Sequence, residues 1–324
     1  MTSAVVILGE NLVDIFIDAD GRLTPIPGGG PFTVARTVAR LGQHAYFFSG
    51  LSKDTFGVQL REVLRADGVV PAFERASEMP TSLALVRANG GAAHYAFYLS
   101  DTAAFENDAT ATLDRYGRLA VPGALYVGTL GLIVEPMAEA AAALVAAADP
   151  TTLVVVDPNC RPTAAGNQDR YRARLLDLFR RADVVKVSTD DLSFITPHQE
   201  TLDAARDIAA RGPRWIVITD GPHPVRLMGP HGISTFPVDD RPIVDTVGAG
   251  DALVGGLLAW WTGHNLDRRA IEDVAAVTDA VAAGIEIASI TCERRGAEPP
   301  LMAELGDVAA WAWLQPTKKS QPST

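Results

Sequence analysis

The sequence predicts an α/β protein with a mainly parallel central sheet between two layers of helices, and a small separate β-layer. From Leu125 onward, short continuous apolar runs alternate with helical patterns, as in a parallel sheet buried on both faces. Earlier in the chain, residues 12–27 and 81–99 instead alternate apolar and polar side chains around turn sequences, which is typical of hairpins. These hairpins do not fit the parallel sheet, so we assign both to the small layer.

The first half of the chain holds both predicted hairpins. Val5–Leu8 is an apolar run that ends at a glycine and predicts a buried strand. The first hairpin follows and turns at Asp20-Gly21, and the second joins its strands through Asn89-Gly90-Gly91. Between the hairpins, residue spacing predicts helices over 32–41 and 56–66 and a strand over 46–49.

The second half of the chain predicts alternating strands and helices. Strands are expected over 125–127, 153–156, 184–187 and 215–219, and helices over 135–148, 168–181 and 192–195. We expect one domain over residues 1–314 and a polar, disordered tail over 315–324.

Composition limits the class of protein. The chain of 324 residues is 48% apolar and 21% charged, so it can bury a sizeable core. A formal net charge of −11 argues against a nucleic-acid or anionic-membrane partner. The two cysteines, Cys160 and Cys292, have no metal-binding spacing and suggest a reducing compartment. No basic leader precedes Val5–Leu8, and no apolar run is long enough and free enough of glycine and charge to span a bilayer, so we expect a cytoplasmic protein.

The stretch with the most chemical content is Asp245-Thr246-Val247-Gly248-Ala249-Gly250-Asp251, directly before the apolar run 252–261. Its small residues let several backbone N–H groups point the same way, and the following helix adds its positive end, so an anion site is expected. An acid at such a site, Asp251, can take the proton from a hydroxyl that attacks a phosphoryl group. The alternative is a glycine turn with Asp251 as an ordinary helix N-cap, and spacing alone gives this alternative at least equal weight.

Polar residues also follow the predicted strands, at the edge where ligands of parallel sheets gather. Asp157, Asn159 and Arg161 suit a polyhydroxylated or acidic ligand or a hydrated metal, or else form a polar turn fixed by two prolines. Ser188-x-x-Asp191 can organise water around Mg²⁺ and is equally a helix-capping pattern.

The hairpins supply further candidate ligand contacts. Asp14 can bind a hydroxyl, although an exposed strand residue needs no function. Gly28-Gly29-Gly30 lets the backbone approach a ligand closely, or serves as a hinge. Tyr95 and Tyr98 can cover the face of a sugar, although strand aromatics more often only pack.

Several common motifs are missing from the sequence. No GxxxxGK[ST] is present, and no GxGxxG follows a predicted strand, which excludes a P-loop enzyme and disfavours a dinucleotide-binding fold. GxSxG and the protein-kinase HRD motif are also absent. A phosphate site that uses none of these motifs leaves few families.

With these residues in view, the chain resembles the ribokinase-like (PfkB) carbohydrate kinases, in particular the fructokinase and 2-keto-3-deoxygluconate kinase branch. The likeness covers roughly residues 5–300, and its most specific part is the segment from Asp245 to Asp251. The other matching positions are Gly9-Glu10 with Asp14, Gly28-Gly29 through Ala35, 39–42, Asp54 to Gly57 with Gly68-Val69, Phe97-Tyr98 with Ala103, Asp157-x-Asn159-x-Arg161, and Cys292 with 295–297.

The resemblance implies a three-layer α/β/α core whose small β-sheet forms a lid, and often a dimer paired through the lid strands. It implies ATP, Mg²⁺ and often a stimulating monovalent cation such as K⁺. Asp251 would be the general base, with the amides of Gly248, Ala249 and Gly250 as the anion hole. The remaining implied roles are sugar contacts by Asp14, Gly28, Gly29, Thr33, Tyr98 and Arg161, nucleotide contacts by Lys186, Ser188, Thr219 and Gly221, Mg²⁺ organised through water by Asp191, and a monovalent cation near Asp245.

This chain departs from the family pattern at a few positions. Thr33 stands where these kinases usually have a sugar-contacting asparagine, Ser188 and Asp191 replace a longer Asn and Glu, and Pro224 replaces a glycine. These changes affect the choice of substrate more than the class of reaction.

We therefore expect an ATP-dependent kinase that phosphorylates a primary hydroxyl of a small sugar. Fructose is the first expectation, because 128–132 with Glu135-Pro136 resembles fructokinases. The alternative is 2-keto-3-deoxygluconate, because Arg161 can pair with a substrate carboxylate. A nucleoside kinase and a non-catalytic sugar-sensing protein on the same fold are further alternatives. A nicotinamide oxidoreductase is disfavoured by the missing fingerprint.

Overall fold

The computed structural model describes residues 3–18, 20–89, 92–238 and 241–306. Its main sheet has nine strands in the order β13-β12-β11-β10-β9-β8-β1-β4-β5. At one edge β12 pairs antiparallel with both β11 and β13, and all the other neighbours pair parallel. In sheet order the bounds are Gly232–Phe236, His223–Gly229, Trp215–Asp220, Val184–Ser188, Leu153–Asp157, Ala124–Gly128, Val5–Leu8, Ala45–Phe48 and Val70–Pro71.

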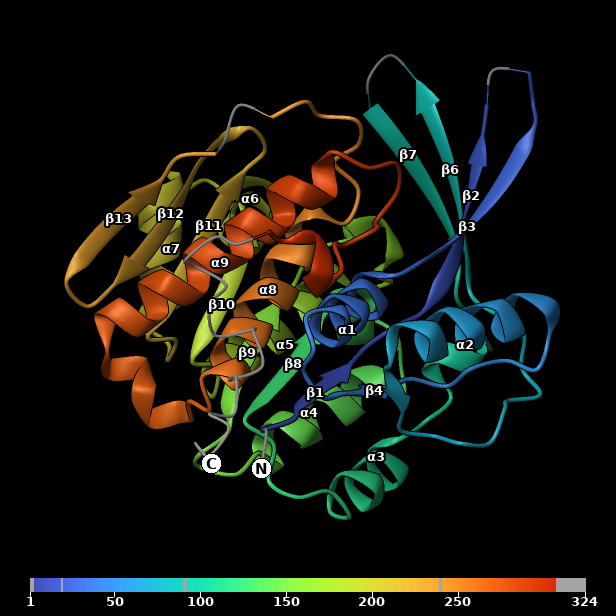
Figure 1. Cartoon of the computed structure of the whole chain (residues 1–324), viewed down its shortest axis with the longest axis horizontal. Coiled ribbons are helices and arrows are strands. Elements are labelled where there is room, and N and C mark those ends of the chain that lie inside the picture. The colour runs from blue at the N-terminus through green and yellow to red at the C-terminus, as the bar shows by residue number, and fades with distance from the viewer. Residues whose placement is uncertain (1–2, 19, 90–91, 239–240, 307–324) are drawn as a thin grey trace, which may run out of the picture.

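Helices cover both faces of this sheet (Figure 1). One face packs on α1 (Gly30–Arg40), α2 (Thr55–Asp67), α8 (Ala249–Gly263) and α9 (Val274–Cys292). The other face packs on α3 (Ala109–Tyr116), α4 (Met137–Ala147), α5 (Gln168–Phe179), α6 (Thr189–Ile195) and α7 (Thr201–Ala209). Strand side chains alternate between the two apolar cores, so Val5 and Ile7 face one and Val6 and Leu8 face the other. The predicted three-layer α/β/α core is confirmed.

A second sheet stands at one end of the core as a separate layer (Figure 1). Its four strands lie in the order β3-β2-β6-β7, with bounds Leu23–Gly28, Leu12–Ile17, Leu83–Asn89 and Ala92–Tyr98. β2 pairs antiparallel with β3 and β6 with β7, as predicted, and the two hairpins join through a parallel pairing of β2 with β6. We call this sheet the lid.

Short 3₁₀ turns complete the described elements: η1 (Ala103–Phe105), η2 (Thr129–Leu132), η3 (Pro162–Ala164), η4 (Arg268–Glu272) and η5 (Met302–Glu304).

Three helices begin at other residues than predicted, for local reasons. α1 begins at Gly30, two residues early, because Pro31 suits a first helical turn. α4 begins only at Met137, after Pro136. α6 begins at Thr189, because Ser188 caps it.

One expectation about an apolar segment is wrong. In sequence, the residues 242–244 ahead of the glycine turn predict the end of an extended segment, but no strand is assigned within 241–248, where Val244 N instead donates to Cys292 O at 2.8 Å. One helix, α9, is long and apolar enough to cross a bilayer by length and composition. Its Val277, Val281 and Ile287 side chains are buried in the core beside α8, which accounts for the apolar composition as that of a core helix.

Candidate functional site

A cavity of about 890 Å³ lies between the lid and the carboxyl ends of the central strands. The lid contributes Leu12, Asp14, Tyr95 and Phe97, and the core contributes the turn before α8. Parallel strands and their following helices end at this edge, so N–H groups and polar side chains converge there. The cavity brings together residues from positions 10 to 297.

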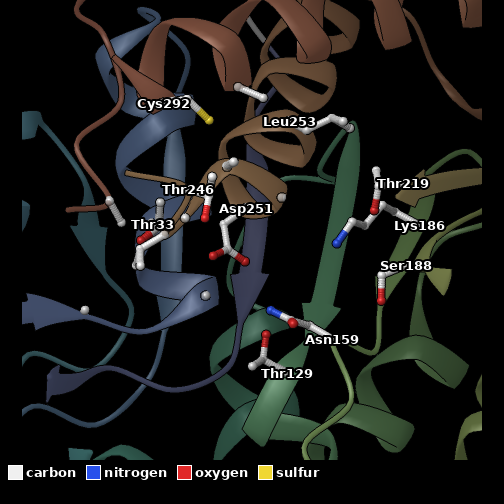
Figure 2. Close-up of a pocket in the computed structure, with 18 of the residues that line it drawn as sticks. Thr33, Thr129, Asn159, Lys186, Ser188, Thr219, Thr246, Asp251, Leu253 and Cys292 are labelled. Atoms are coloured by element: carbon white, nitrogen blue, oxygen red, sulfur yellow. The ribbon is translucent and has the colours of Figure 1, made fainter. Parts of the chain in front are cut away.

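Asp251 lies at the centre of the cavity (Figure 2). Gly248 is the N-cap of α8 in the left-handed region at φ +78°, and no side chain caps this helix. Asp251 is therefore not the N-cap, and its Oδ1 is buried without a hydrogen-bond partner. Burial raises the pKa of Asp251 against the lowering effect of Lys186 and Arg161. A buried acid with an unpartnered oxygen facing a cavity can accept a proton from a ligand.

Gly30 faces the same carboxylate from the start of α1. A Cβ at Gly30 would lie 2.7 Å from Asp251 Oδ1 and 2.6 Å from Thr129 Oγ1. Thr129 has φ +54°, a strained conformation for a β-branched residue, and its hydroxyl is also buried without a partner. Both oxygens are therefore available to a hydroxyl of a ligand beside Gly30. Thr129 was missed as a site residue, because strand-end threonines carry no pattern of their own.

Glu10 supports the floor of the cavity from the end of β1. Its Oε1 accepts from Gly30 N at 3.2 Å and its Oε2 accepts from Gly131 N at 3.1 Å. Burial raises the pKa of Glu10 to about 8, against the lowering effect of these backbone donors. Glu10 thus ties the two turns that flank Asp251. In sequence, Glu10 stood out only by its place near the end of a buried strand and by the family match at Gly9-Glu10, and neither gives it a role.

Lys186 faces the anion turn from β10. Its Nζ lies 3.1 Å from Asp157 Oδ2, and a Cβ at Gly250 would lie 2.9 Å from the same Nζ. Burial lowers the pKa of Lys186, but the neighbouring carboxylates of Asp157, Asp191 and Asp251 outweigh this effect and raise the pKa above its ordinary value. Burial also raises the pKa of Asp157 to about 7. A buried cation beside the N–H groups of α8 makes this corner of the cavity attractive to an anion.

The lid side of the cavity carries Asp14 and Tyr95. Asp14 Oδ2 would lie 2.2 Å from a Cβ at Gly28, so only glycine leaves room for this carboxylate. Burial raises the pKa of Asp14 to about 7, partly offset by Arg161. Arg161 Nη1 donates to Asn159 Oδ1 at 2.7 Å, and Asn159 takes a left-handed φ of +36°. The predicted sugar contacts Gly29 and Thr33 also line the cavity.

The opposite end of the cavity carries the predicted nucleotide contacts. Ser188, Thr219 and Gly221 line this end, and Figure 2 shows Ser188 and Thr219 near Lys186. Apolar residues of β12, α8 and α9 lie alongside, namely Val225, Leu253, Ile285 and Ala288. These side chains were not predicted as site residues, because their apolar pattern is that of any core strand or helix.

Three predicted site residues lie outside the cavity lining. The Tyr98 side chain is 58% exposed, because strand alternation turns Tyr95 and Phe97 inward in its place. The capping interpretation of Asp191 is correct, since its Oδ2 accepts from Ser188 N and Oγ, and its Oδ1 accepts from Cys160 N at 2.6 Å. The carboxylate of Asp245 accepts from Val247 N at 3.0 Å and Gly296 N at 2.9 Å, and so joins two loops.

Comparison with known proteins matches residues 4–304 to the sequence profile of the pfkB family of carbohydrate kinases. The chain is 31% identical over 256 residues to a protein named fructokinase from Rhizobium leguminosarum bv. trifolii, and the match covers 78% of this chain and 77% of the relative.

Solved structures share the fold. An aminoimidazole riboside kinase from Salmonella enterica, solved with aminoimidazole riboside and an ATP analogue, is 25% identical with a TM-score of 0.76, covering 91% of this chain and 95% of that one. A fructokinase from Vibrio cholerae, solved with fructose, ADP and calcium ion, is 24% identical with a TM-score of 0.78, covering 97% and 99%. The predicted ribokinase-like fold, with its small second sheet, is confirmed.

Proposed function

The chain belongs to the pfkB family of carbohydrate kinases, and we propose that it transfers the γ-phosphate of ATP to a primary hydroxyl of fructose. The fructokinases among its relatives support the sugar, and the cavity supports the reaction. The alternatives of a non-catalytic sugar sensor and of a sugar-acid kinase are not favoured.

The observation that carries the proposal is the unpartnered Asp251 Oδ1 beside the N-terminal turn of α8. With a sugar hydroxyl next to Gly30, Asp251 accepts its proton as the oxygen attacks phosphorus. The N–H groups of Gly248 and Gly250 and the Lys186 ammonium then face the transferring phosphoryl group, where negative charge must be stabilised. The third predicted donor, Ala249 N, makes a long bond of 3.3 Å to Thr246 O, which it would exchange for the phosphoryl group. The residues supply a base and an anion hole from adjacent positions of one helix start.

The two ends of the cavity suit the two substrates. Asp14, the glycines at 28–30 and Thr129 offer hydroxyl partners at the lid end. Val225, Ile285 and Ala288 offer apolar surface for a nucleotide base at the other end, with Ser188 and Thr219 nearby. The lid covers the sugar end and excludes water, which would otherwise accept the phosphoryl group.

The described residues contain no group of three His, Cys, Asp or Glu side chains able to hold a metal ion by themselves. Mg²⁺ is expected with the nucleotide, since Mg²⁺ keeps several waters and takes phosphate oxygens as ligands. Asp191 already accepts three hydrogen bonds, so we assign it the capping of α6 and no direct metal contact. A monovalent cation such as K⁺ near Asp245 stays a prediction.

A coupled ATP-consumption assay over fructose, other hexoses, pentoses, sugar acids and ribosides tests the proposal. We expect fructose to give the highest kcat/KM and a phosphate ester in amounts equal to the ADP formed. ADP formation independent of any sugar would contradict the proposal. The riboside arm is included because a riboside kinase shares the fold.

The Arg161→Ala variant separates fructose from the sugar-acid alternative. Arg161 lines the cavity beside Asp14, where it can pair with a substrate carboxylate. For a fructokinase, the variant loses activity on neutral sugars and sugar acids to a similar degree. If the wild-type protein phosphorylates sugar acids and the variant loses activity on sugar acids alone, the result would favour 2-keto-3-deoxygluconate as the substrate.

We also propose a cytoplasmic homodimer paired through the lid. The lid exposes the apolar side chain of Leu23 and the aromatic side chain of Tyr98, both 58% exposed. Sedimentation at micromolar concentration is expected to give the mass of two chains. A single-chain mass at that concentration would contradict the dimer.

A further inference from the structure

The loop that follows α9 lies directly against the anion turn. A Cβ at Gly248 would lie 2.3 Å from Cβ of Ala297, so the turn and this loop fit together without spare room. Gly248 is also the residue whose left-handed φ starts α8. A displacement of Ala297 would therefore reach the N–H groups of Gly248–Gly250.

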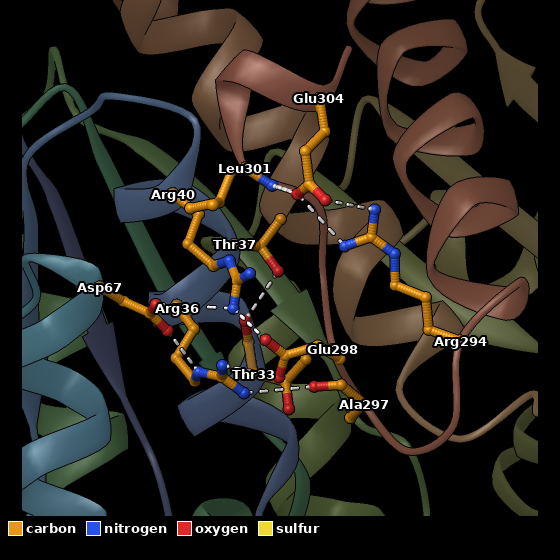
Figure 3. Close-up of polar contacts among 10 residues, drawn as sticks. All are labelled: Thr33, Arg36, Thr37, Arg40, Asp67, Arg294, Ala297, Glu298, Leu301 and Glu304. Carbon is orange, nitrogen blue, oxygen red and sulfur yellow. Dashed lines mark hydrogen bonds and ion pairs between the residues drawn. The ribbon is translucent and has the colours of Figure 1, made fainter.

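Three consecutive residues fasten this loop in place. Gly296 N donates to Asp245 Oδ2 at 2.9 Å, and Ala297 O accepts from Arg36 Nη1 at 3.4 Å. Glu298 accepts from Arg36 Nη2 at 2.8 Å and also from Arg40 Nη1 (Figure 3). The loop is thus held to the turn on one side and to α1 on the other.

The two arginines are shared with a second acid on another element. Arg36 Nε lies 2.6 Å and Arg40 Nη1 3.5 Å from the carboxylate of Asp67, the last residue of α2. Both arginine side chains are more than nine-tenths buried, and they balance two carboxylates with two positive charges. Asp67 and Glu298 therefore serve the same cations, but only Glu298 belongs to the loop that packs on the anion turn (Figure 3).

We propose that Glu298, held by Arg36 and Arg40, is a positioning residue that keeps the Gly248–Gly250 turn in its catalytic geometry. This inference rests on the proposed function, because it requires the turn to face the transferring phosphoryl group. Glu298 does not line the cavity, so it acts through Ala297 and Gly248. Its loss is expected to lower kcat more than it raises KM for the sugar, since the N–H groups of the turn face the transferring phosphoryl group.

The matched pair Glu298→Ala and Asp67→Ala tests the proposal. Each variant removes one carboxylate from the same two arginines, so a merely structural role predicts equal effects. We expect Glu298→Ala to lower kcat by about 10- to 100-fold, as small displacements of a catalytic group do, and Asp67→Ala to change kcat by less than about twofold. Glu298→Gln keeps one acceptor oxygen of the same length and is expected to recover part of the loss.

Stability must be measured on the same variants. Urea unfolding shows whether each variant is folded in the assay, and the milder Glu298→Gln and Asp67→Asn pair replaces any variant that is not. Equal kcat losses in the two members of the folded pair would overturn the proposal, and so would an unchanged kcat in Glu298→Ala. Failure of the proposed function is distinguishable, because the wild-type protein would then show no sugar-dependent ATP consumption.

Discussion

Two groups of charged side chains in this protein are built differently. Around α1, Arg36 and Arg40 face Asp67 and Glu298, so two cations meet two acids through short contacts. In the cavity, Asp251 Oδ1 is buried without a hydrogen-bond partner, whereas the nearby Asp157 Oδ2 is paired with Lys186 Nζ at 3.1 Å. The first group balances its charges, although Arg40 Nε has no hydrogen-bond partner, and in the second group the acceptor oxygen of Asp251 is left unpartnered.

This difference in pairing distinguishes charged groups that stabilise the fold from charged groups that are placed for chemistry. Burial raises the pKa of Glu298, but Arg36 and Arg40 lower it by more, so this carboxylate stays ionised and paired. In the cavity, burial raises the pKa of Glu10 to about 8 and of Asp14 and Asp157 to about 7. A buried acid with an unpartnered oxygen costs stability, so the persistence of Asp251 at the cavity indicates that a ligand completes it.

Replacing Asp251 gives the largest expected change in activity. Asp251→Asn keeps the shape of the side chain and removes the base, so kcat for fructose should fall by about 10²–10⁴-fold. A coupled assay measures the loss, and circular dichroism checks that the fold is unchanged. Turnover within about threefold of wild type would show that another group accepts the proton.

Breaking the α1 cluster gives the largest expected change in stability. Arg36→Ala leaves Asp67 and Glu298 with one arginine, which should lower the free energy of unfolding by about 3–5 kcal/mol in urea titrations. The control is Arg118→Ala, which breaks an exposed pair with Asp114 and should cost less than about 1 kcal/mol. Similar losses of unfolding free energy in both variants would show that the Arg36 contacts stabilise the fold no more than an exposed ion pair does.

Filling the gap beside Asp251 is expected to have an intermediate effect. Gly30→Ala places a methyl group 2.6–2.7 Å from Thr129 Oγ1 and Asp251 Oδ1, so kcat/KM for the sugar should fall by up to about 10²-fold. Gly166→Ala is the control, because a Cβ there meets no atom within 4 Å. An unaffected Gly30→Ala enzyme would mean that the hydroxyl does not bind between these two oxygens.

The pH dependence is expected to be the smallest effect and to have opposite signs for activity and stability. Ionised Asp14 and Asp251 are needed for reaction, so kcat/KM should fall as the pH drops through about 7, the pKa of Asp14. The folded state holds protons on Glu10, Asp14 and Asp157 that the unfolded chain releases near its ordinary values of 3.8–4.5. Between about pH 4 and 8 the free energy of unfolding should therefore decrease as the pH rises.

Pairs of unfolding and kinetic measurements at the same pH values check this prediction. A fall in kcat/KM centred near pH 4, or a free energy of unfolding that increases between pH 5 and 8, would show that the fold does not hold these acids protonated. The α1 cluster contributes in the opposite direction, because the lowered pKa of Glu298 stabilises the fold above its unfolded pKa and loses this effect as the pH falls.

Much of the fold could be predicted from local pattern. Continuous apolar strands and alternating hairpin strands differ along the chain itself, so the main sheet and the lid were separable before their arrangement was known. The parallel pairing of β2 with β6 was not predictable, because it joins segments about seventy residues apart in sequence. Helix starts shifted where a serine cap or a proline decided the first turn.

The candidate site was likewise predictable from the sequence only in part. The turn at Gly248–Asp251 could be found because glycine spacing and an acid carry chemistry in sequence. The choice between Tyr95 and Tyr98 depends on which face of β7 turns inward, and sequence alternation does not give that face. Glu10 and Thr129 could not be assigned roles, since these depend on backbone groups of distant turns.

The stability of Asp251→Asn tests the central claim most directly. If Asp251 is a base kept unpartnered for chemistry, the variant relieves a buried charge and should gain about 0.5–2 kcal/mol in free energy of unfolding at pH 8. If Asp251 instead holds the start of α8 as a cap would, the same variant should lose about 0.5–2 kcal/mol, and that result would contradict the account.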